Sequence, residues 1–227
     1  MMRHRLIAVG VLLALARLCA GATVLPTVHA AVKLVVDGDA GEWAALPGVL
    51  TRQLGDKPDG PTVAMTWDGA NLDLAFTVPQ PKDTVTRVPI SLPFSDGLWR
   101  RGDRVEWYVT VGDDTFHYVF MPTGDCFRII VKKGGFEEGH DADFAYKARI
   151  LPDRWCGEVQ IGLEDSPFPL PKRHPDWAMR FVYTNIAAKT TLAWPVPKAD
   201  ADPPPSETVH FSPDPPAKPV PPAPAGK

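Results

Sequence analysis

The chain has 227 residues, of which 44% are hydrophobic and 22% charged, and its formal net charge is −3 at pH 7. These proportions are typical of a globular protein and exclude wholesale disorder, and the single short apolar run excludes a polytopic membrane protein. The mildly acidic charge argues against nucleic acids and anionic membrane surfaces as partners, because both attract basic proteins.

The first 30 residues have the pattern of a secretory signal peptide. Arg3 and Arg5 precede the apolar stretch Leu6–Ala16, which is too short to span a bilayer. Small residues that suit cleavage follow near Ala22 and again near Ala30. We therefore predict a signal peptide over residues 1–30 and a secreted or periplasmic protein, with an uncleaved anchor as the alternative.

The middle of the chain reads as an all-β domain, because short apolar or alternating runs are separated by turn residues. We predict a two-sheet antiparallel β-sandwich of the jelly-roll type over residues 31–212. Residues 213–227 are rich in proline and predict a disordered tail with extended polyproline conformers. The predicted strands are Lys33–Val36, Val63–Trp67, Leu72–Val78, Arg104–Val111, Phe116–Met121, Phe127–Lys132, Phe144–Leu151, Trp155–Leu163, Met179–Ile186 and the short Thr208–Phe211.

One hairpin can be predicted in detail, because Arg104–Val111 alternates between an apolar and a polar face. If Gly112-Asp113 forms a two-residue turn, Tyr108 lies opposite His117. Glu106, Tyr108 and His117 then cluster on the face turned away from the core. A slip of one residue in the register would place His117 on the other face.

The three cysteines leave two questions open. Cys19 suggests a lipoprotein, but Leu18 disfavours lipid attachment because a small residue is expected before a lipidated cysteine. Cys126 and Cys156 could form a disulfide in an oxidising compartment, provided that their strands are neighbours. The cysteines and histidines do not have the spacing of a zinc site, and we predict no metal ligands with this chemistry.

Five segments, in this order, resemble those of family 9 carbohydrate-binding modules. The opening segment resembles the family's pattern "hydrophobic-D-G-x-x-x-E-W", the third resembles "D-x-V-E" followed by hydrophobic residues, and the fourth resembles "W-x-x-E". The resemblance extends over about residues 32 to 212 and implies a β-sandwich that binds a glycan. The five segments are Val36–Trp43, Val63–Phe76, Asp103–Val109, Trp155–Ile161 and Ala193–Pro195.

The resemblance also implies a carbohydrate-binding site in which two tryptophans clamp a sugar ring and polar residues bind its hydroxyls. Trp99 stands in the place of the first clamp tryptophan, and Glu106 in that of the strand glutamate that binds hydroxyls. His117 corresponds to a polar residue on the next strand. The second clamp tryptophan falls near His210 or Phe211, so His210 is included as a substitute.

One departure from the family pattern concerns an arginine, and a further feature of the family concerns a metal ion. The arginine that the family carries on the strand after Glu106 falls at Val119. Family members often hold structural calcium, and Asp37, Asp39 and Glu42 could supply oxygen ligands for it. A purely turn-forming role of these residues is the alternative.

We predict that the protein is not an enzyme, because the sequence has no G-x-S-x-G, no H-E-x-x-H and no phosphate-binding glycine loop. One alternative to sugar binding is a structural or assembly module without a small ligand. A second is an exported haem-binding domain with axial ligands from methionine or histidine. The residues available for this second alternative are Met65, Met121, His117 and His210. The sequence makes no prediction of the oligomeric state.

Overall fold

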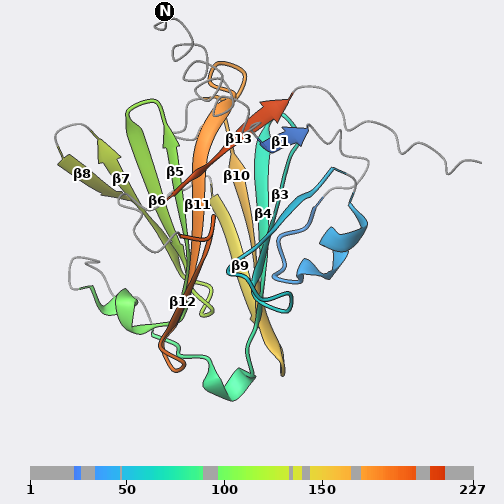
Figure 1. Cartoon of the computed structure of the whole chain (residues 1–227), viewed down its shortest axis with the longest axis vertical. Helices are drawn as coiled ribbons and strands as arrows, with labels where there is room; N and C mark the ends of the chain where they lie inside the picture. Colours follow the sequence, from blue (N-terminus) through green and yellow to red (C-terminus); the bar gives the residue numbers. More distant parts are fainter. Residues whose placement is uncertain are drawn as a thin grey trace, which may run out of the picture.

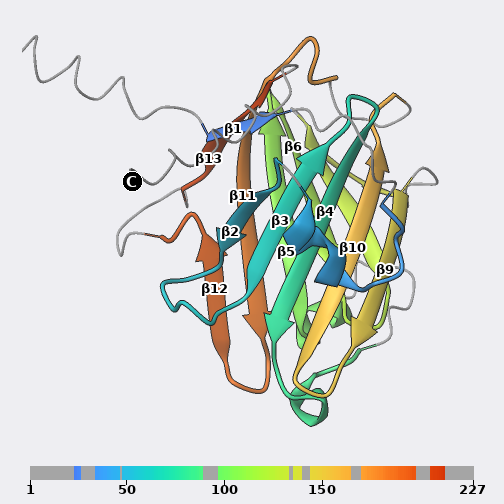
Figure 2. The same cartoon turned by 90° about the vertical axis from the view of Figure 1, so that its right-hand side faces the viewer.

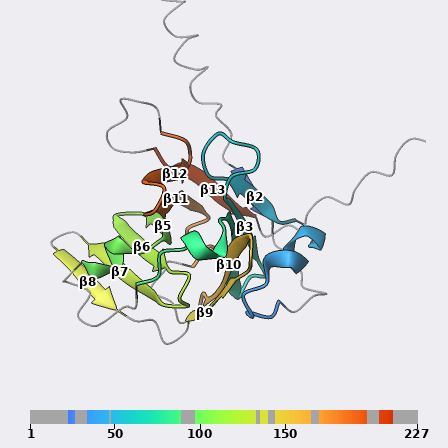
Figure 3. The same ribbon diagram turned by 90° about the horizontal axis from the view of Figure 1, so that it is seen from below.

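The computed structural model describes residues 23–26, 34–46, 48–88, 97–132, 135–139, 144–164, 170–197 and 205–212. The predicted tail and most of the predicted signal peptide lie outside these residues. In the part of the chain that is described, the strands form two sheets packed face to face (Figures 1 and 3).

Sheet A has its strands in the order β1-β13-β11-β5-β6-β7-β8. The short strand β12 pairs with the end of β11 that β13 leaves free, so β12 and β13 share one edge of β11. All pairs in this sheet are antiparallel except β1 and β13, which are parallel. The bounds are β1 (Thr23–Pro26), β5 (Arg104–Val111), β6 (Asp114–Phe120), β7 (Cys126–Lys132), β8 (Gly135–Gly139), β11 (Asp176–Asn185), β12 (Thr190–Trp194) and β13 (Glu207–Ser212).

Sheet B has the order β2-β3-β4-β10-β9, and all of its pairs are antiparallel. Its strands are β2 (Leu50–Gln53), β3 (Thr62–Trp67), β4 (Asn71–Pro79), β9 (Phe144–Ile150) and β10 (Arg154–Gly162). In the part of the chain that is described, three short 3₁₀ helices lie outside the sheets: η1 (Ala40–Ala45), η2 (Lys82–Thr84) and η4 (Leu98–Arg101). The prediction of an all-β, antiparallel two-sheet sandwich is therefore confirmed.

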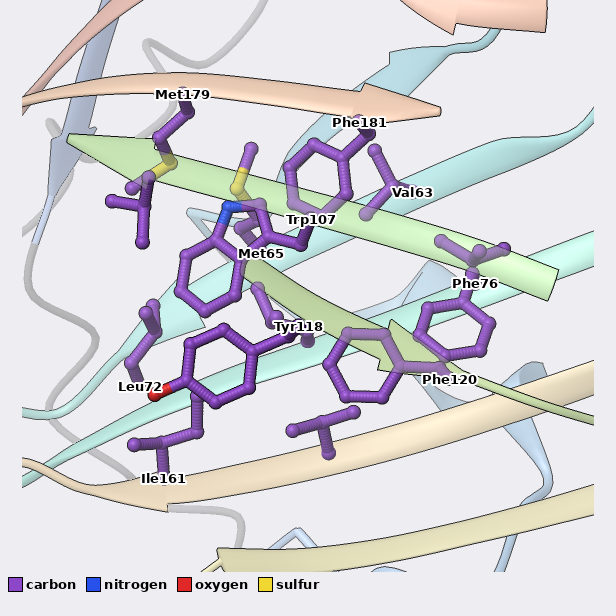
Figure 4. Close-up of a cluster of buried hydrophobic side chains, with 14 of the residues drawn as sticks. Val63, Met65, Leu72, Phe76, Trp107, Tyr118, Phe120, Ile161, Met179 and Phe181 are labelled. Carbon is purple, nitrogen blue, oxygen red and sulfur yellow. The ribbon is translucent and has the colours of Figure 1, made fainter. Parts of the chain in front are cut away.

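The core lies between the two sheets and is built from alternate residues of each strand, as the pleat requires (Figure 4). Trp107 of β5 stacks on Phe181 of β11 with ring centroids 5.8 Å apart. Phe76 of β4 meets the edge of Trp155 at 5.7 Å. Gly157 also faces this interior, and a Cβ atom there would lie 2.1 Å from Cε2 of Phe76. The phenyl ring thus occupies the space that a side chain at position 157 would need.

The opening motif is tied to β10 by one carboxylate, that of Glu158. Its Oε2 accepts hydrogen bonds from the backbone N–H groups of Asp37 and Gly38, at 2.9 and 2.8 Å. Its Oε1 accepts from Nε1 of Trp43 at 2.8 Å. Figure 2 shows the result, with η1 lying across β4 and β10 on the outer side of sheet B. Glu158 and Trp43 therefore hold two distant segments together.

The predicted strands differ from the observed ones at several places. The predicted strand Lys33–Val36 is wrong, because Leu34–Val36 form no strand and lead into the turn held by Glu158. The sequence did not predict β1, β2, β8 or β12, which lie at sheet edges or are short. β1 falls inside the predicted signal peptide, so cleavage near Ala22 would keep this strand and cleavage near Ala30 would remove it.

Cys126 and Cys156 form no disulfide. Cys126 lies on β7 of sheet A, whereas Cys156 lies on β10 of sheet B. Trp155 and Gly157 point into the core, so Cys156 points to the outer side of sheet B, where its Sγ is 3.8 Å from Oγ1 of Thr77. The disulfide considered from the sequence is therefore excluded by the alternation of the strand. None of the helices in the described ranges combines the length and apolar character needed to cross a bilayer.

Candidate functional site

The candidate site lies on the outer face of sheet A, which is the face turned away from sheet B. Figure 1 shows the four strands that carry it, β11, β5, β6 and β7, side by side. The predicted hairpin is confirmed, with Tyr108 opposite His117 and Glu106 opposite Val119. Its turn is Gly112-Asp113, and Gly112 has φ +62°, which a glycine adopts without strain.

Asp103 fixes the entrance to β5 and with it the position of the neighbouring helix η4. Its buried carboxylate accepts hydrogen bonds from Nε2 of Gln80, from the N–H of Thr86 and from the N–H of Ile186, at 2.7, 2.8 and 2.7 Å. The aspartate of the "D-x-V-E" motif therefore has a structural role. It anchors the loop from which Trp99 reaches the sheet.

Trp99 belongs to a small apolar cluster on the outer face of sheet A, which we call the outer cluster: Trp99, Val119, Met121 and Phe127. The indole meets the ring of Phe127 at 5.1 Å between centroids and that of His117 at 6.1 Å. Gly102 allows this close packing, because a Cβ atom there would lie 2.6 Å from Cε of Met121. Trp99 is only 6% exposed, so it is packed into the surface and does not stand free of it.

Glu106 is the centre of a polar network beside the outer cluster. Its Oε1 accepts a hydrogen bond from Nε of Arg104 at 2.9 Å. Its Oε2 accepts from Oη of Tyr108 at 2.8 Å and lies 2.9 Å from Nε2 of His117. The side chain of Glu106 is 7% exposed, yet it lies on the face away from the main core. A carboxylate placed there is not required by the packing of the sandwich.

The surroundings of Glu106 keep it ionised. Burial raises the pKa of its carboxyl, but the hydrogen bond with His117, the charge of Arg104 and the hydrogen bond from Tyr108 lower it, and the lowering prevails. Burial and the negative charge of Glu106 raise the pKa of the Tyr108 hydroxyl well above its usual value. Tyr108 therefore remains a neutral hydrogen-bond donor at physiological pH.

Aromatic rings and guanidinium groups contact one another on this face. The rings of Tyr108 and His117 are stacked, with centroids 4.1 Å apart and planes at 9°. The guanidinium of Arg180 lies 5.6 Å from the centroid of Tyr108. Arg100 and Arg104 lie 5.0 and 5.1 Å from the ring of Trp99. Such contacts are attractive because a cation meets the negative face of a π-system.

The structure brings together three of the four residues predicted from the sequence: Trp99, Glu106 and His117. It places His210 elsewhere, at the corner where β13 pairs with the start of β11, with Nδ1 2.8 Å from Oδ1 of Asp176. In the register of β11, that position is six residues from the one opposite Glu106, or about 20 Å along the strand. His210 is therefore not a neighbour of the other three.

Three arginines of this face were not predicted as site residues. Arg104 could have been found from the sequence, because it shares the alternation of Glu106 along β5. Arg180 could not, since its position follows from the pairing of β11 with β5, whose residues are far apart in the chain. Arg100 lies in η4, for which the sequence offers no periodic signal.

The residues considered for calcium are used in other ways. Oδ1 of Asp37 accepts from the N–H of Asp39, and Oδ1 of Asp39 accepts from the N–H of Gly41, at 2.8 and 3.1 Å. Oδ2 of Asp39 is 3.3 Å from Nη1 of Arg149. Within the described ranges, no three His, Cys, Asp or Glu side chains are grouped so that they could hold a metal ion. The contacts of Asp37 and Asp39 are those of a turn, and calcium binding by Asp37, Asp39 and Glu42 stays a prediction from the sequence.

The residues considered for haem do not converge on one site. Met65 lies in the core between the sheets, on the opposite side of sheet A from His117. Met121 is fully buried under Trp99 in the outer cluster. His210 is paired with Asp176 at a distant corner.

Comparison with solved structures identifies proteins with a similar fold. No protein-family model and no curated protein matches the sequence. Among solved structures, a family 9 carbohydrate-binding module from Caldicellulosiruptor kristjanssonii in complex with cellotriose is similar at 16% identity and a TM-score of 0.54, covering 89% of this chain and 99% of that one. The same kind of module from that organism in complex with glucose has a TM-score of 0.54 at 16% identity, over 87% and 100% of the two chains. A presumed carbohydrate-binding protein from Bacteroides uniformis has a TM-score of 0.55 at 11% identity, over 85% and 100%.

Proposed function

We propose that the protein is a non-catalytic carbohydrate-binding protein whose site is the outer face of sheet A around Glu106. The chain has the fold of family 9 carbohydrate-binding modules, as the sequence resemblance predicted, and two structures with this fold hold cellotriose or glucose. The observation that carries the proposal is the network of Glu106. An ionised, nearly buried carboxylate holds Arg104, Tyr108 and His117 beside Trp99, on a face where core packing does not need it.

This arrangement suits a sugar, which has an apolar ring face and a rim of hydroxyl groups. Glu106 orients Arg104 and the stacked Tyr108–His117 pair, which supply donors and acceptors for hydroxyls. The apolar contact comes from the indole of Trp99. The guanidinium of Arg100 now lies over that ring, but Arg100 is exposed, and an exposed cation–π contact contributes only about 0.5–1 kcal/mol. A sugar can therefore displace it.

The test is titration of the purified protein with glucose, cellobiose, cellotriose and xylo-oligosaccharides, followed by Trp fluorescence and by calorimetry. We expect Glu106→Gln to weaken the binding at least about tenfold, because it removes a charge that holds three side chains in place. His210→Ala is the matched comparison and should leave the affinity unchanged, since His210 lies about 20 Å away along the sheet. Circular dichroism of each variant shows that it is folded.

A response to no sugar, or equal affinities of the parent protein and Glu106→Gln, would contradict the proposal. One observation favours the alternative of a structural module without a sugar ligand: the low exposure of Trp99. The same titration separates these two functions. A Soret absorption band in the protein as purified would instead indicate haem.

A further inference from the structure

The part of the outer face of sheet A between the hairpin turn and η4 carries more positive than negative charge, although the chain as a whole is acidic. This part is formed by the outward-facing residues of β11, β5, β6 and β7. The strand register places two arginines there, Arg104 and Arg180, and one carboxylate, that of Glu106. Arg100 of η4 lies over Trp99 beside them. Glu106 is already neutralised by Arg104, so the positive charge of the other two arginines is not balanced on this face.

Arg180 is the most informative of these arginines. Arg52, Arg104, Arg149 and Arg154 each have a carboxylate within ion-pair distance. Within the described ranges Arg180 has none, and its buried Nε has no hydrogen-bond partner. Its guanidinium lies over Tyr108, whose ring stacks on His117. Buried donors nearly always have a partner in a folded protein, so a missing acceptor points to a ligand.

The described carboxylates nearest to Arg180 on this face are those of Glu106 and Asp176, and both have other partners. Asp176 lies four residues away on β11, about 13 Å along the strand, and is paired with His210.

We propose that the site selects an acidic sugar, a hexuronate, whose carboxylate is bound by Arg180. This inference rests on the proposed function. The planar guanidinium fork matches a carboxylate and forms charge-assisted hydrogen bonds with it, which are stronger than those to a hydroxyl. The ring of the sugar then lies toward Trp99 and the Tyr108–His117 pair, as in the proposed site, and Arg180 reads the substituent at C6.

The test compares D-glucuronate with D-glucose, which differ only in the oxidation of C6, by calorimetry on the purified full chain. A matched pair of oligomers, oligogalacturonate and its methyl ester, extends the comparison. We expect each charged form to bind about tenfold more tightly than its neutral counterpart. This preference should weaken when the salt concentration rises from about 0.05 to about 1 M, because the electrostatic screening length becomes short over this range.

Arg180→Gln should remove the preference, because it should lower the affinity for glucuronate about tenfold more than the affinity for glucose. Arg154→Gln, at the exposed first residue of β10 in sheet B, removes the same charge away from the site and should keep the preference. Equal affinities for glucuronate and glucose would overturn this inference and leave the proposed function intact. Binding of neither sugar class would overturn the proposed function itself.

Discussion

Single residues decide how tightly the two sheets can approach each other. At position 157, the interior space belongs to the ring of Phe76, and a methyl group there would meet the ring edge at 2.1 Å. Because β4 and β10 are paired along their whole length, the backbone cannot move aside at one residue alone. Glycine is therefore required here by a neighbouring side chain.

We expect Gly157→Ala to lower the free energy of unfolding by about 1–3 kcal/mol, through overpacking of the core. Gly135→Ala is the control, because no atom lies within 4 Å of a Cβ built there. Urea denaturation of both variants measures the difference. Equal midpoints for Gly157→Ala and the parent protein would show that the core has free space at this position.

Asp73 is a second residue with a definite effect on stability. It is 5% exposed on the outer side of sheet B, and its Oδ1 accepts a hydrogen bond from Nε2 of Gln160 at 2.8 Å. Burial raises the pKa of this carboxyl to about 6, against the lowering by Gln160. The folded state therefore binds a proton that the unfolded state has already released between about pH 4 and 6.

This linkage predicts that the contribution of Asp73 to stability falls as the pH rises from about 4 to 6, and stays low above that. Asp73→Asn keeps the acceptor for Gln160 and removes the charge. We expect it to stabilise the protein at pH 7 by about 1–3 kcal/mol, with no gain at pH 4. Urea denaturation at the two pH values checks this. A loss of stability at pH 7 would mean that the ionised form of Asp73 is needed.

Among the strands, the long ones could be predicted from the local pattern of apolar and turn residues. The positions of the short and edge strands depend on pairing between residues far apart in the chain. The β5–β6 hairpin could be predicted with its register, because its turn and its alternation are both written in adjacent residues. This placed Glu106, Tyr108 and His117 together correctly. Arg180 joins them only through the pairing of β11 with β5, which adjacent residues do not specify.

Pairing between distant strands also determines the position of His210. It was included because the family keeps an aromatic residue near the end of the domain, yet β13 pairs with the far end of β11. The short edge strand β1 was missed for a different reason, since its apolar residues continue the apolar character of the predicted signal peptide. Composition alone does not separate a leader from a buried strand that follows it.

Strand β1 leads to a prediction about the mature protein. Leu25 is fully buried, its carbonyl oxygen accepts a hydrogen bond from Nε1 of Trp67 at 3.1 Å, and the Thr23 hydroxyl is bound to Arg52 and Glu207. A chain that starts at Thr23 should therefore be more stable than one that starts at Ala31, by about 2–5 kcal/mol. Thermal unfolding of the two proteins measures this difference.

Equal melting temperatures would show that β1 adds nothing to the fold. If the protein is exported, as the sequence predicts, mass spectrometry of the secreted or periplasmic form should give a start near Thr23. A start at Ala31 would contradict the role that the structure gives to β1.

For the whole molecule, the sequence predicted the architecture, while the carbohydrate-binding role of the candidate site stays a prediction. The resemblance to family 9 modules agrees with the fold, and its "D-G-x-x-x-E-W" and "W-x-x-E" motifs are explained by the contact of Glu158 with Trp43 and the turn before it. These motifs therefore stabilise the fold. The binding function that we propose would depend on the outer face of sheet A, where residues from β5, β6, β11 and η4 meet.

A carbohydrate site on the outer face of sheet A is tested most directly by a two-dimensional ¹⁵N–¹H NMR titration of the labelled protein with cellotriose and with glucuronate. We expect concentration-dependent shifts of the Trp99 indole signal and of the amides of Glu106, Tyr108 and His117. The indole signal of Trp43, on the outer side of sheet B, should remain in place. Shifts confined to sheet B, or no shifts up to millimolar sugar, would contradict a carbohydrate site on the outer face of sheet A.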